Sequence, residues 1–291
     1  MLFRLYDIVH QNSLFRQFKV NDLLFVEYKC LNDEQKLKVL SMQNFFMYIL
    51  GGKKVWRTLQ GTYEARAGQA VFVKKGANIV HQFYDDEFCA VIIFLPDHFI
   101  TETIQQSELS APAPAATDAV ILLQMEPLLH TYFQSVSSYF GQEEKPPAAL
   151  LELKFKELIL SVFASGKNQP LAGFLQSLCQ KNKNCIREVM ETNFIFNIGL
   201  EEFARLSNRS LASFKRDFFA IYHTSPGRWL VQKKLSYAKQ LLETTDENIN
   251  ELSYNAGFES PSHFIRLFKQ HYHITPLQYK KQLNAEKEEA A

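Results

Sequence analysis

The sequence contains few cysteines and no metal-binding spacing among them. The four cysteines stand at positions 30, 89, 179 and 185 and form no C-x-x-C pair, which argues against a zinc finger or ribbon. The first residues, MLFRLYDIVHQN, lack the continuous apolar core of a signal peptide, and no run of eighteen apolar residues occurs. We therefore expect a reduced, cytoplasmic protein that does not enter a membrane.

Recognisable catalytic patterns are also missing. We find no paired carboxylates, no nucleophile elbow and no phosphate-binding loop, and residues 1–110 hold three histidines, His10, His81 and His98, with no H-x-H pair. A metal site that needs several histidines is therefore not expected. The sequence predicts no cofactor, no metal and no enzymatic activity.

Charge is balanced over most of the chain. The formal net charge is +1, and Lys+Arg exceeds Asp+Glu only between residues 184 and 284, by 13 to 10. So small a surplus has meaning only if the cations share one face. The last third of the chain is where a polyanionic partner would bind.

The chain of 291 residues with 46% apolar content is long enough for two domains. Short segments rich in Val, Ile, Phe and Tyr fill residues 20–100, which predicts an antiparallel sandwich or barrel. The segment ELSAPAPAATD at 108–118 reads as a linker, and from residue 118 the apolar spacing becomes helical. The helices at 118–165 either cover the barrel core or associate with a second subunit.

The last third of the chain contains a repeat. RLSNRSLASFKRDFFAIYHTSPGRW is followed fifty residues later by AGFESPSHFIRLFKQHYHITPLQY, so that Phe214, Arg216 and Phe218 recur as Phe264, Arg266 and Phe268. Tyr222 and Pro226 likewise recur as Tyr272 and Pro276. A repeat of this kind indicates a supersecondary unit used twice.

Each copy predicts a helix, a tight turn and a second helix. Small Ala204 and Ser253 are placed for close helix packing, and Asn208 and Gly257, four residues later, suit a left-handed turn. Ser210 and Ser260 are predicted N-caps, and Pro261 suits the first helical position. A helix over 228–242, about 22 Å long, joins the two copies.

The second helix of each copy has one apolar stripe and one polar face. The predicted stripe consists of Leu211, Phe214, Phe218, Phe264, Leu267 and Phe268. Small, polar and cationic side chains on the other face suit a major groove. The predicted DNA-binding residues are Arg209, Ser210, Ala212, Ser213, Lys215, Arg216, Ser260, Pro261, Ser262, His263, Ile265, Arg266 and Lys269.

Two alternatives remain open for this region. The helices could be an all-helical scaffold, although such arrays usually need three or more units. Arg266 could also form a salt bridge with Glu251 or Glu259 rather than contact DNA.

Residues 184–283 resemble the DNA-binding domain of the AraC/XylS family of bacterial transcription regulators. The second copy carries the resemblance in Ala256, Gly257, Phe258, Ser260, Phe264, Arg266, Phe268 and Pro276, and departs from the family at Ser253 and Glu259. The resemblance implies two helix-turn-helix units reading successive major grooves of an asymmetric promoter site. It also implies an activator that works with RNA polymerase, while the broad apolar faces of the helices at 118–165 predict a homodimer.

The strand-rich segment AGQAVFVKKGANIVHQF resembles the cupin-like sensory half of such regulators. A pocket there would take an effector with Tyr48, Trp56, Arg57, Tyr63 and His81. Other segments resemble the AraC-like activators of type III secretion, whose sensory half answers to a protein. The effector is thus a small molecule or a protein, and the alternative is a cupin-type metalloenzyme with a helical module.

The predicted fold class is α+β with three regions. Residues 1–110 form a cupin-like barrel, 111–183 a linker and helical dimerisation region, and 184–291 an all-α domain with two helix-turn-helix motifs joined by a helix.

Overall fold

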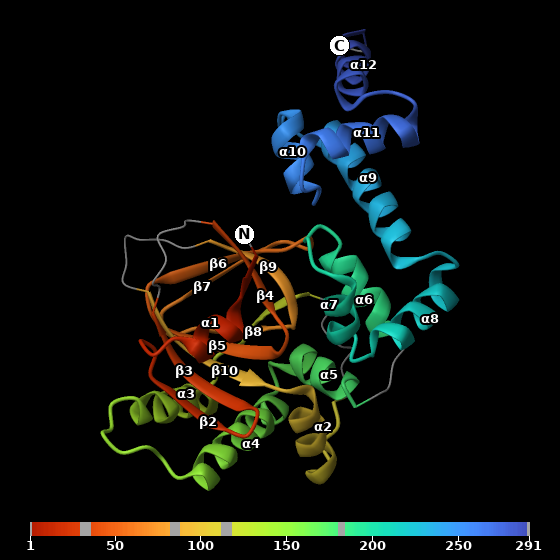
Figure 1. Ribbon diagram of the computed structural model, residues 1–291. Coiled ribbons are helices and arrows are strands. Elements are labelled where there is room, and N and C mark those ends of the chain that lie inside the picture. Colours follow the sequence, from red (N-terminus) through yellow and green to blue (C-terminus); the bar gives the residue numbers. More distant parts are fainter. Residues whose placement is uncertain (1, 30–35, 82–87, 112–117, 180–183, 290–291) are drawn as a thin grey trace. The chain divides into compact units, whose positions relative to one another are not determined.

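The computed structural model describes all residues except 1, 30–35, 82–87, 112–117, 180–183 and 290–291. The chain divides into two compact units, Met1–Asn182 and Lys183–Ala291. The first contains both sheets and the second is helical (Figure 1). The predicted α+β class is confirmed, while the three-region division stays a prediction.

The first unit is built on two hydrogen-bonded sheets. The six-stranded sheet runs β11(Val120–Leu122), β8(Ala70–Val73), β5(Asn44–Gly51), β10(Cys89–Leu95), β3(Leu23–Lys29), β2(Gln17–Val20). The five-stranded sheet runs β1(Leu2–Arg4), β4(Lys36–Ser41), β9(Gly76–His81), β6(Lys53–Arg57), β7(Thr62–Arg66). Among the strand pairs of the described residues, only β1–β4 is parallel. Within the described residues the two sheets do not close into the expected barrel.

The six-stranded sheet is covered on both faces, which explains its uninterrupted apolar strands. Alternate residues such as Phe45, Val71 and Ile92 belong to a core shared with the five-stranded sheet. Their neighbours, such as Phe46 and Ile93, pack instead with helices of the same unit. These helices are α2(Asp97–Gln106), α3(Pro127–Tyr139), α4(Ala148–Ala164) and α5(Gln169–Ser177), while α1(Leu5–Gln11) follows β1.

The helix expected from residue 118 begins later. Val120–Leu122 forms strand β11, in which Val120 faces Val73 and Ile121 faces Phe72 across the pair. The β-branched residues suit this sheet edge better than a helix. Pro127 then occupies the first turn of α3, where its missing N–H costs nothing. Most of the predicted linker, 112–117, lies outside the described residues.

The second unit has seven described helices. α6(Asn184–Asn193) precedes two similar helix pairs, α7(Leu200–Leu206) with α8(Leu211–Tyr222) and α10(Ile249–Asn255) with α11(Pro261–Tyr272). α9(Pro226–Thr244) runs from the first pair to the second, and α12(Pro276–Glu289) follows α11 as α9 follows α8 (Figure 1). Each copy of the sequence repeat is therefore a three-helix unit, and the predicted linker helix is confirmed with a longer span.

Candidate nucleic-acid interface

The turn of each helix pair has the predicted backbone. Asn208 has φ 54° and Gly257 has φ 88°, both in the left-handed region. Ala204 and Ser253 are 1% and 0% exposed, so the small side chains lie where the helices pack closely. Each pair is thus a tight helix-turn-helix.

The N-caps of α8 and α11 are also as predicted. The Ser210 hydroxyl accepts a hydrogen bond from the Ser213 amide, and the Ser260 hydroxyl accepts one from the His263 amide, both at 3.3 Å. Each cap satisfies an amide that the first helical turn leaves without a partner. The two helices therefore begin in the same way.

Four phenylalanines anchor the two helices. Phe214, Phe218, Phe264 and Phe268 are all 0% exposed. Phe218 packs on Tyr222 and Trp229 of the first copy of the repeat, and Phe268 packs on Tyr272 and Tyr279 of the second copy. Leu211 and Leu267 of the predicted stripe are half-buried. Because these rings fix which side is buried, they also fix which side of each helix faces outward.

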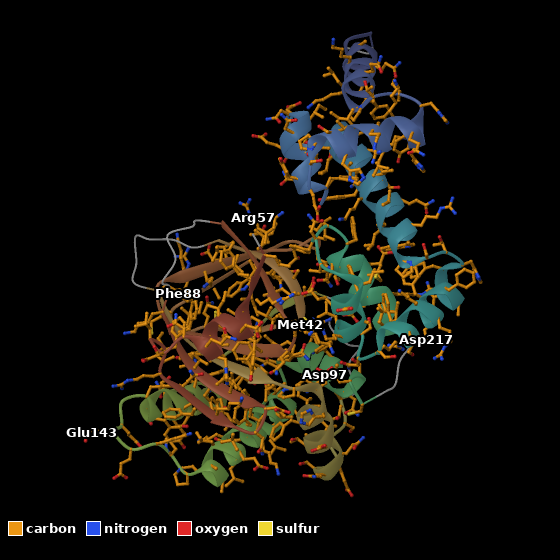
Figure 2. The ribbon with its side chains drawn as sticks, viewed as in Figure 1. Met42, Arg57, Phe88, Asp97, Glu143 and Asp217 are labelled. Carbon is orange, nitrogen blue, oxygen red and sulfur yellow. The ribbon has the colours of Figure 1, made fainter. Side chains whose placement is uncertain are left out.

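The outer face of α8 is small and cationic. Ala212, Lys215 and Arg216 are exposed, while Ser213 is half-buried. Arg216 Nε lies 3.1 Å from the Asp217 carboxylate, and its guanidinium also donates to the Ser213 hydroxyl at 3.3 Å. Figure 2 labels Asp217 on α8.

Arg209 behaves differently from the residues around it. Its side chain is 18% exposed, lies 3.1 Å from Asp217 and donates to the Ser207 carbonyl at 2.7 Å. The hydrogen bond from Arg209 is the main cause that lowers the pKa of Asp217, with Arg216 adding to it. Arg209 therefore braces the turn onto α8, and a DNA contact by it stays a prediction.

The outer face of α11 is more varied. Ser262, His263, Arg266 and Lys269 are exposed and Ile265 is 36% exposed, while Ser260 and Pro261 are half-buried. Although Arg266, Glu251 and Glu259 all lie in the described part of the chain, no ion pair joins Arg266 to either carboxylate. The alternative salt bridge of Arg266 is therefore not formed in the described structure, and its contact with DNA stays a prediction.

One exposed residue was missed. Phe219 on α8 is 58% exposed and stands fifty residues before Lys269. The repeat alignment could have identified it, because a residue equivalent to an outward-facing lysine also faces outward. The outer face of α8 therefore includes an aromatic ring.

The candidate effector residues do not form one group. Tyr48 is 7% exposed and stacks on Phe133 at 4.6 Å, on the helix-covered side of the six-stranded sheet. Trp56 is 1% exposed and lies in the core between the sheets. Arg57 is exposed, and the side chain of His81 is not among those described.

Tyr63 is held by the start of the segment that leads into β11. Its hydroxyl donates to Asp118 at 2.7 Å. Burial first, and then this hydrogen bond, raise the pKa of Tyr63 to about 12.

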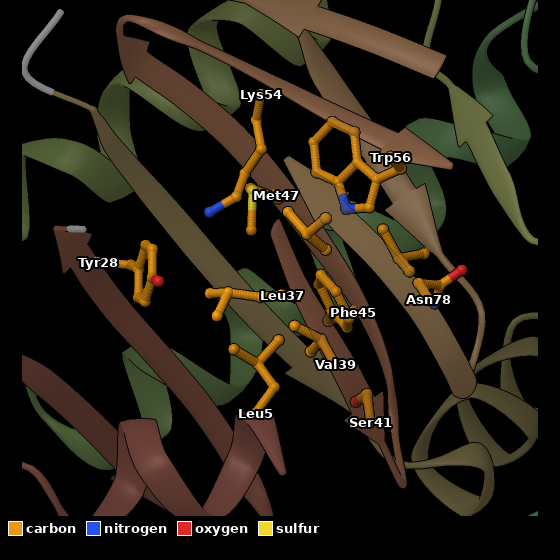
Figure 3. Close-up of a pocket in the computed structure, with 12 residues that line it drawn as sticks. Leu5, Tyr28, Leu37, Val39, Ser41, Phe45, Met47, Lys54, Trp56 and Asn78 are labelled. Atoms are coloured by element: carbon orange, nitrogen blue, oxygen red, sulfur yellow. The ribbon is translucent and has the colours of Figure 1, made fainter. Parts of the chain in front are cut away.

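A small cavity lies between the two sheets (Figure 3). Its volume is about 30 Å³, and Lys54, Ser41 and Asn78 are its polar lining residues among apolar ones such as Trp56. The Lys54 ammonium lies over the rings of Phe88 and Tyr28, at 4.3 and 4.8 Å. A space of this size holds about one water molecule.

The described residues form neither a metal-binding cluster nor a membrane-spanning helix. Among the described residues no three His, Cys, Asp or Glu side chains gather to hold a metal ion. None of the helices in the described ranges has the length and apolarity needed to cross a membrane.

Two family models match this chain. The model of the ExsA N-terminal regulatory domain matches residues 44–174, and that of a helix-turn-helix domain matches residues 203–282. Both are domains of transcription regulators and not of enzymes.

Individual relatives agree with the family models. The virulence regulon transcriptional activator VirF of Yersinia enterocolitica is 26% identical over 251 residues, covering 83% of this chain and 90% of VirF. The regulator ExsA of Pseudomonas aeruginosa is 25% identical over 238 residues, covering 78% and 82%. A crystal structure of Vibrio cholerae ToxT aligns with TM-score 0.45 and 14% identity, covering 92% of this chain and 100% of ToxT.

The two helix-turn-helix pairs, the family models and the sequence relatives VirF and ExsA lead to one conclusion. The chain is a DNA-binding transcriptional regulator. Its two domains match those of AraC family transcriptional regulators.

Proposed function

We propose that the chain activates transcription by inserting α8 and α11 into successive major grooves of promoter DNA. The observation that carries the proposal is the repeated geometry: the same capped helix occurs twice with its aromatic stripe buried and its polar face exposed. The 19 residues of α9 span about 28 Å. That length, with the breadth of the flanking helices, suits grooves one DNA turn apart, about 34 Å.

The side chains divide by the contact that each can make. Arg216 and Arg266 suit guanine edges, and Ile265 suits a thymine methyl group. Lys215 and Lys269 suit phosphates, as do the helix N-termini beside Ser210 and Ser260. Arg209, Ala212, Ser213, Pro261, Ser262 and His263 complete the proposed DNA-binding set.

The two outer faces differ, so the proposed site is asymmetric. Lys215 of α8 corresponds to Ile265 of α11, and Ser213 corresponds to His263. Two helices with different outer residues read different bases, and a single chain reads both half-sites without a partner.

Selection from random DNA tests the proposal. The full chain should enrich one asymmetric motif with two half-sites, and its affinity should fall steeply with salt because phosphate contacts release counterions. Enrichment of no motif would overturn it. The metalloenzyme alternative predicts stoichiometric metal in the purified protein, which elemental analysis measures.

The first unit is proposed to receive the effector. The cavity that the described residues line between the sheets has a volume of about 30 Å³, less than a metabolite would fill, and this supports a protein effector. The further partner that we propose for an activator is RNA polymerase. Because RNA polymerase and promoter DNA are both in the bacterial cytoplasm, the proposed site of action is also there. Calorimetric titration with candidate proteins and metabolites tests the choice.

Self-association through α3 and α4 is a further part of the proposal. Leu128, Leu153 and Leu160 are 51%, 62% and 39% exposed and line one apolar groove. Exposed apolar patches of this kind favour a partner surface. We propose a homodimer that buries this groove.

Light scattering of the full chain tests the dimer. Wild type should be dimeric at micromolar concentration and Leu153→Glu monomeric. Leu14→Glu, which alters a 75% exposed leucine elsewhere in the same unit, should stay dimeric. A wild type that is monomeric at every concentration would contradict the proposal.

A further inference from the structure

Gly257 lies against the backbone of a segment far away in the sequence. A methyl group at this position would lie 2.4 Å from the Ile195 carbonyl oxygen and 2.8 Å from its carbon. Separations under 3 Å to backbone atoms cannot be relieved by a side-chain rotation. Ile195 belongs to the loop between α6 and α7, which precedes the first helix-turn-helix.

The repeat shows why this close contact is informative. Asn208 occupies the equivalent turn of the first copy of the repeat, with φ 54° and an exposed side chain. The left-handed backbone alone is therefore met by Asn as well as by Gly. Gly257 is required in addition by the close approach of Ile195.

Lys234 of α9 joins the same two segments. Its ammonium donates to the Gly257 carbonyl at 2.7 Å and to the Asn197 side-chain oxygen at 3.0 Å. Hydrogen bonds from a charged donor are shorter and stronger than neutral ones. One lysine of the joining helix α9 thus ties the turn of the second helix-turn-helix to the loop that leads into the first helix-turn-helix.

The segments that meet here are well anchored. Phe194, Phe196 and Ile198 are 4%, 4% and 8% exposed, so the loop carrying Ile195 and Asn197 is fixed by alternate buried side chains. Phe194 also meets Tyr237 of α9 at 5.6 Å between ring centroids. Movement of the second helix-turn-helix relative to this loop would break packing as well as hydrogen bonds.

We propose that Ile195, Asn197, Lys234 and Gly257 form a clamp between the two helix-turn-helix copies. This clamp sets the distance and rotation between α8 and α11. The clamp thereby selects the spacing between the two half-sites. The four are positioning residues and need not touch DNA. This inference rests on the proposed function, in which both helices read one site.

Binding to re-spaced DNA tests the clamp in the full chain. The selected site is compared with versions that have one or two base pairs added or removed between the half-sites. One base pair turns the second half-site by about 35°. Wild type should lose about tenfold or more in affinity on re-spaced DNA, since one helix then misses its bases.

Lys234→Met should tolerate the altered spacing. It keeps the apolar stem and removes both hydrogen bonds, so the ratio of affinities for selected and re-spaced DNA should fall to about threefold or less. Lys239→Met is the matched control, because Lys239 is on the same helix but its ammonium lies over the rings of Tyr272 and Tyr279 at 5.5 and 5.4 Å. Both rings belong to the second copy of the repeat. Its ratio should equal that of wild type.

The ratio separates positioning from a general loss of folding or of phosphate attraction, because both of those lower the affinity for every spacing alike. Gly257→Ala, through its clash with Ile195, should lower the ratio as Lys234→Met does, with a lower melting temperature. A wild-type ratio in Lys234→Met would overturn the clamp while leaving the proposed function intact. A wild type that enriches no motif would overturn both.

Discussion

Replacing Arg266 with Ala should reduce DNA affinity without reducing stability. Arg266 is exposed on α11 opposite buried Phe264 and Phe268, and neither Glu251 nor Glu259 pairs with it in the described structure. Alanine favours a helix at least as well as arginine, so the free energy of unfolding should change by less than about 0.5 kcal/mol. Loss of a bidentate guanine contact should weaken specific binding by about 1–3 kcal/mol.

The assay compares affinities by fluorescence anisotropy at one salt concentration. The variant should bind the selected site about 5- to 150-fold more weakly and a scrambled site almost as well as wild type. Circular dichroism should give an unchanged melting temperature. Lys167→Ala, which removes one exposed cation of the first unit, is the control for net charge.

Three results would refute this reasoning about Arg266. Equal affinity for the selected site would show that it makes no contact, and an equal loss on both sites would assign it to phosphate. A lowered melting temperature with a proportionate loss of affinity would return it to a structural role.

Other side chains give independent tests. Asp217→Asn removes the negative charge that lies beside Arg209 and Arg216 and should therefore raise affinity for any DNA and steepen the salt dependence by about one charge; an unchanged salt slope would contradict this. Phe218→Ala removes a ring that is 0% exposed and should lower the free energy of unfolding by about 3–5 kcal/mol, measured in urea, whereas a loss under about 1 kcal/mol would show that the site collapses. The pKa of Tyr63 is raised to about 12, so the unfolded state loses this proton at lower pH and stability falls as pH rises from 10 to 12. Tyr63→Phe should remove that part of the fall, and an identical pH dependence of the urea midpoint in both proteins would refute it.

Local features of the second unit could be predicted because they depend on near neighbours in sequence. A left-handed turn needs Gly or Asn, an N-cap needs a hydroxyl three residues before an amide, and a repeat states the same requirement twice. Asn208, Gly257, Ser210 and Ser260 all satisfy such rules. Their positions follow from spacing alone.

Partners brought together by the tertiary fold could not be predicted in the same way. Arg209 pairs with Asp217, eight residues away, a partner that the sequence pattern did not predict because rotamers and burial decide such pairs; its DNA contact stays a prediction. Strand β11 is three residues long, too short for periodicity to separate it from a helix. The contact of Ile195 with Gly257 depends on the path of a loop that no local pattern records.

The late strand β11 has a consequence for synthesis of the chain. Ala70–Val73 forms β8, whose residues are at most 1% exposed, and among the described strands it is β11, Val120–Leu122, that pairs with its outer edge. Until those residues leave the ribosome, at about 5–20 residues per second, the nascent sheet has a bare apolar edge of the kind that recruits other strands. Its aromatic face also waits for α3 to α5. A polypeptide ended at residue 110 would keep both surfaces open and should aggregate, so the sheet depends on sequence that lies beyond its own main strands.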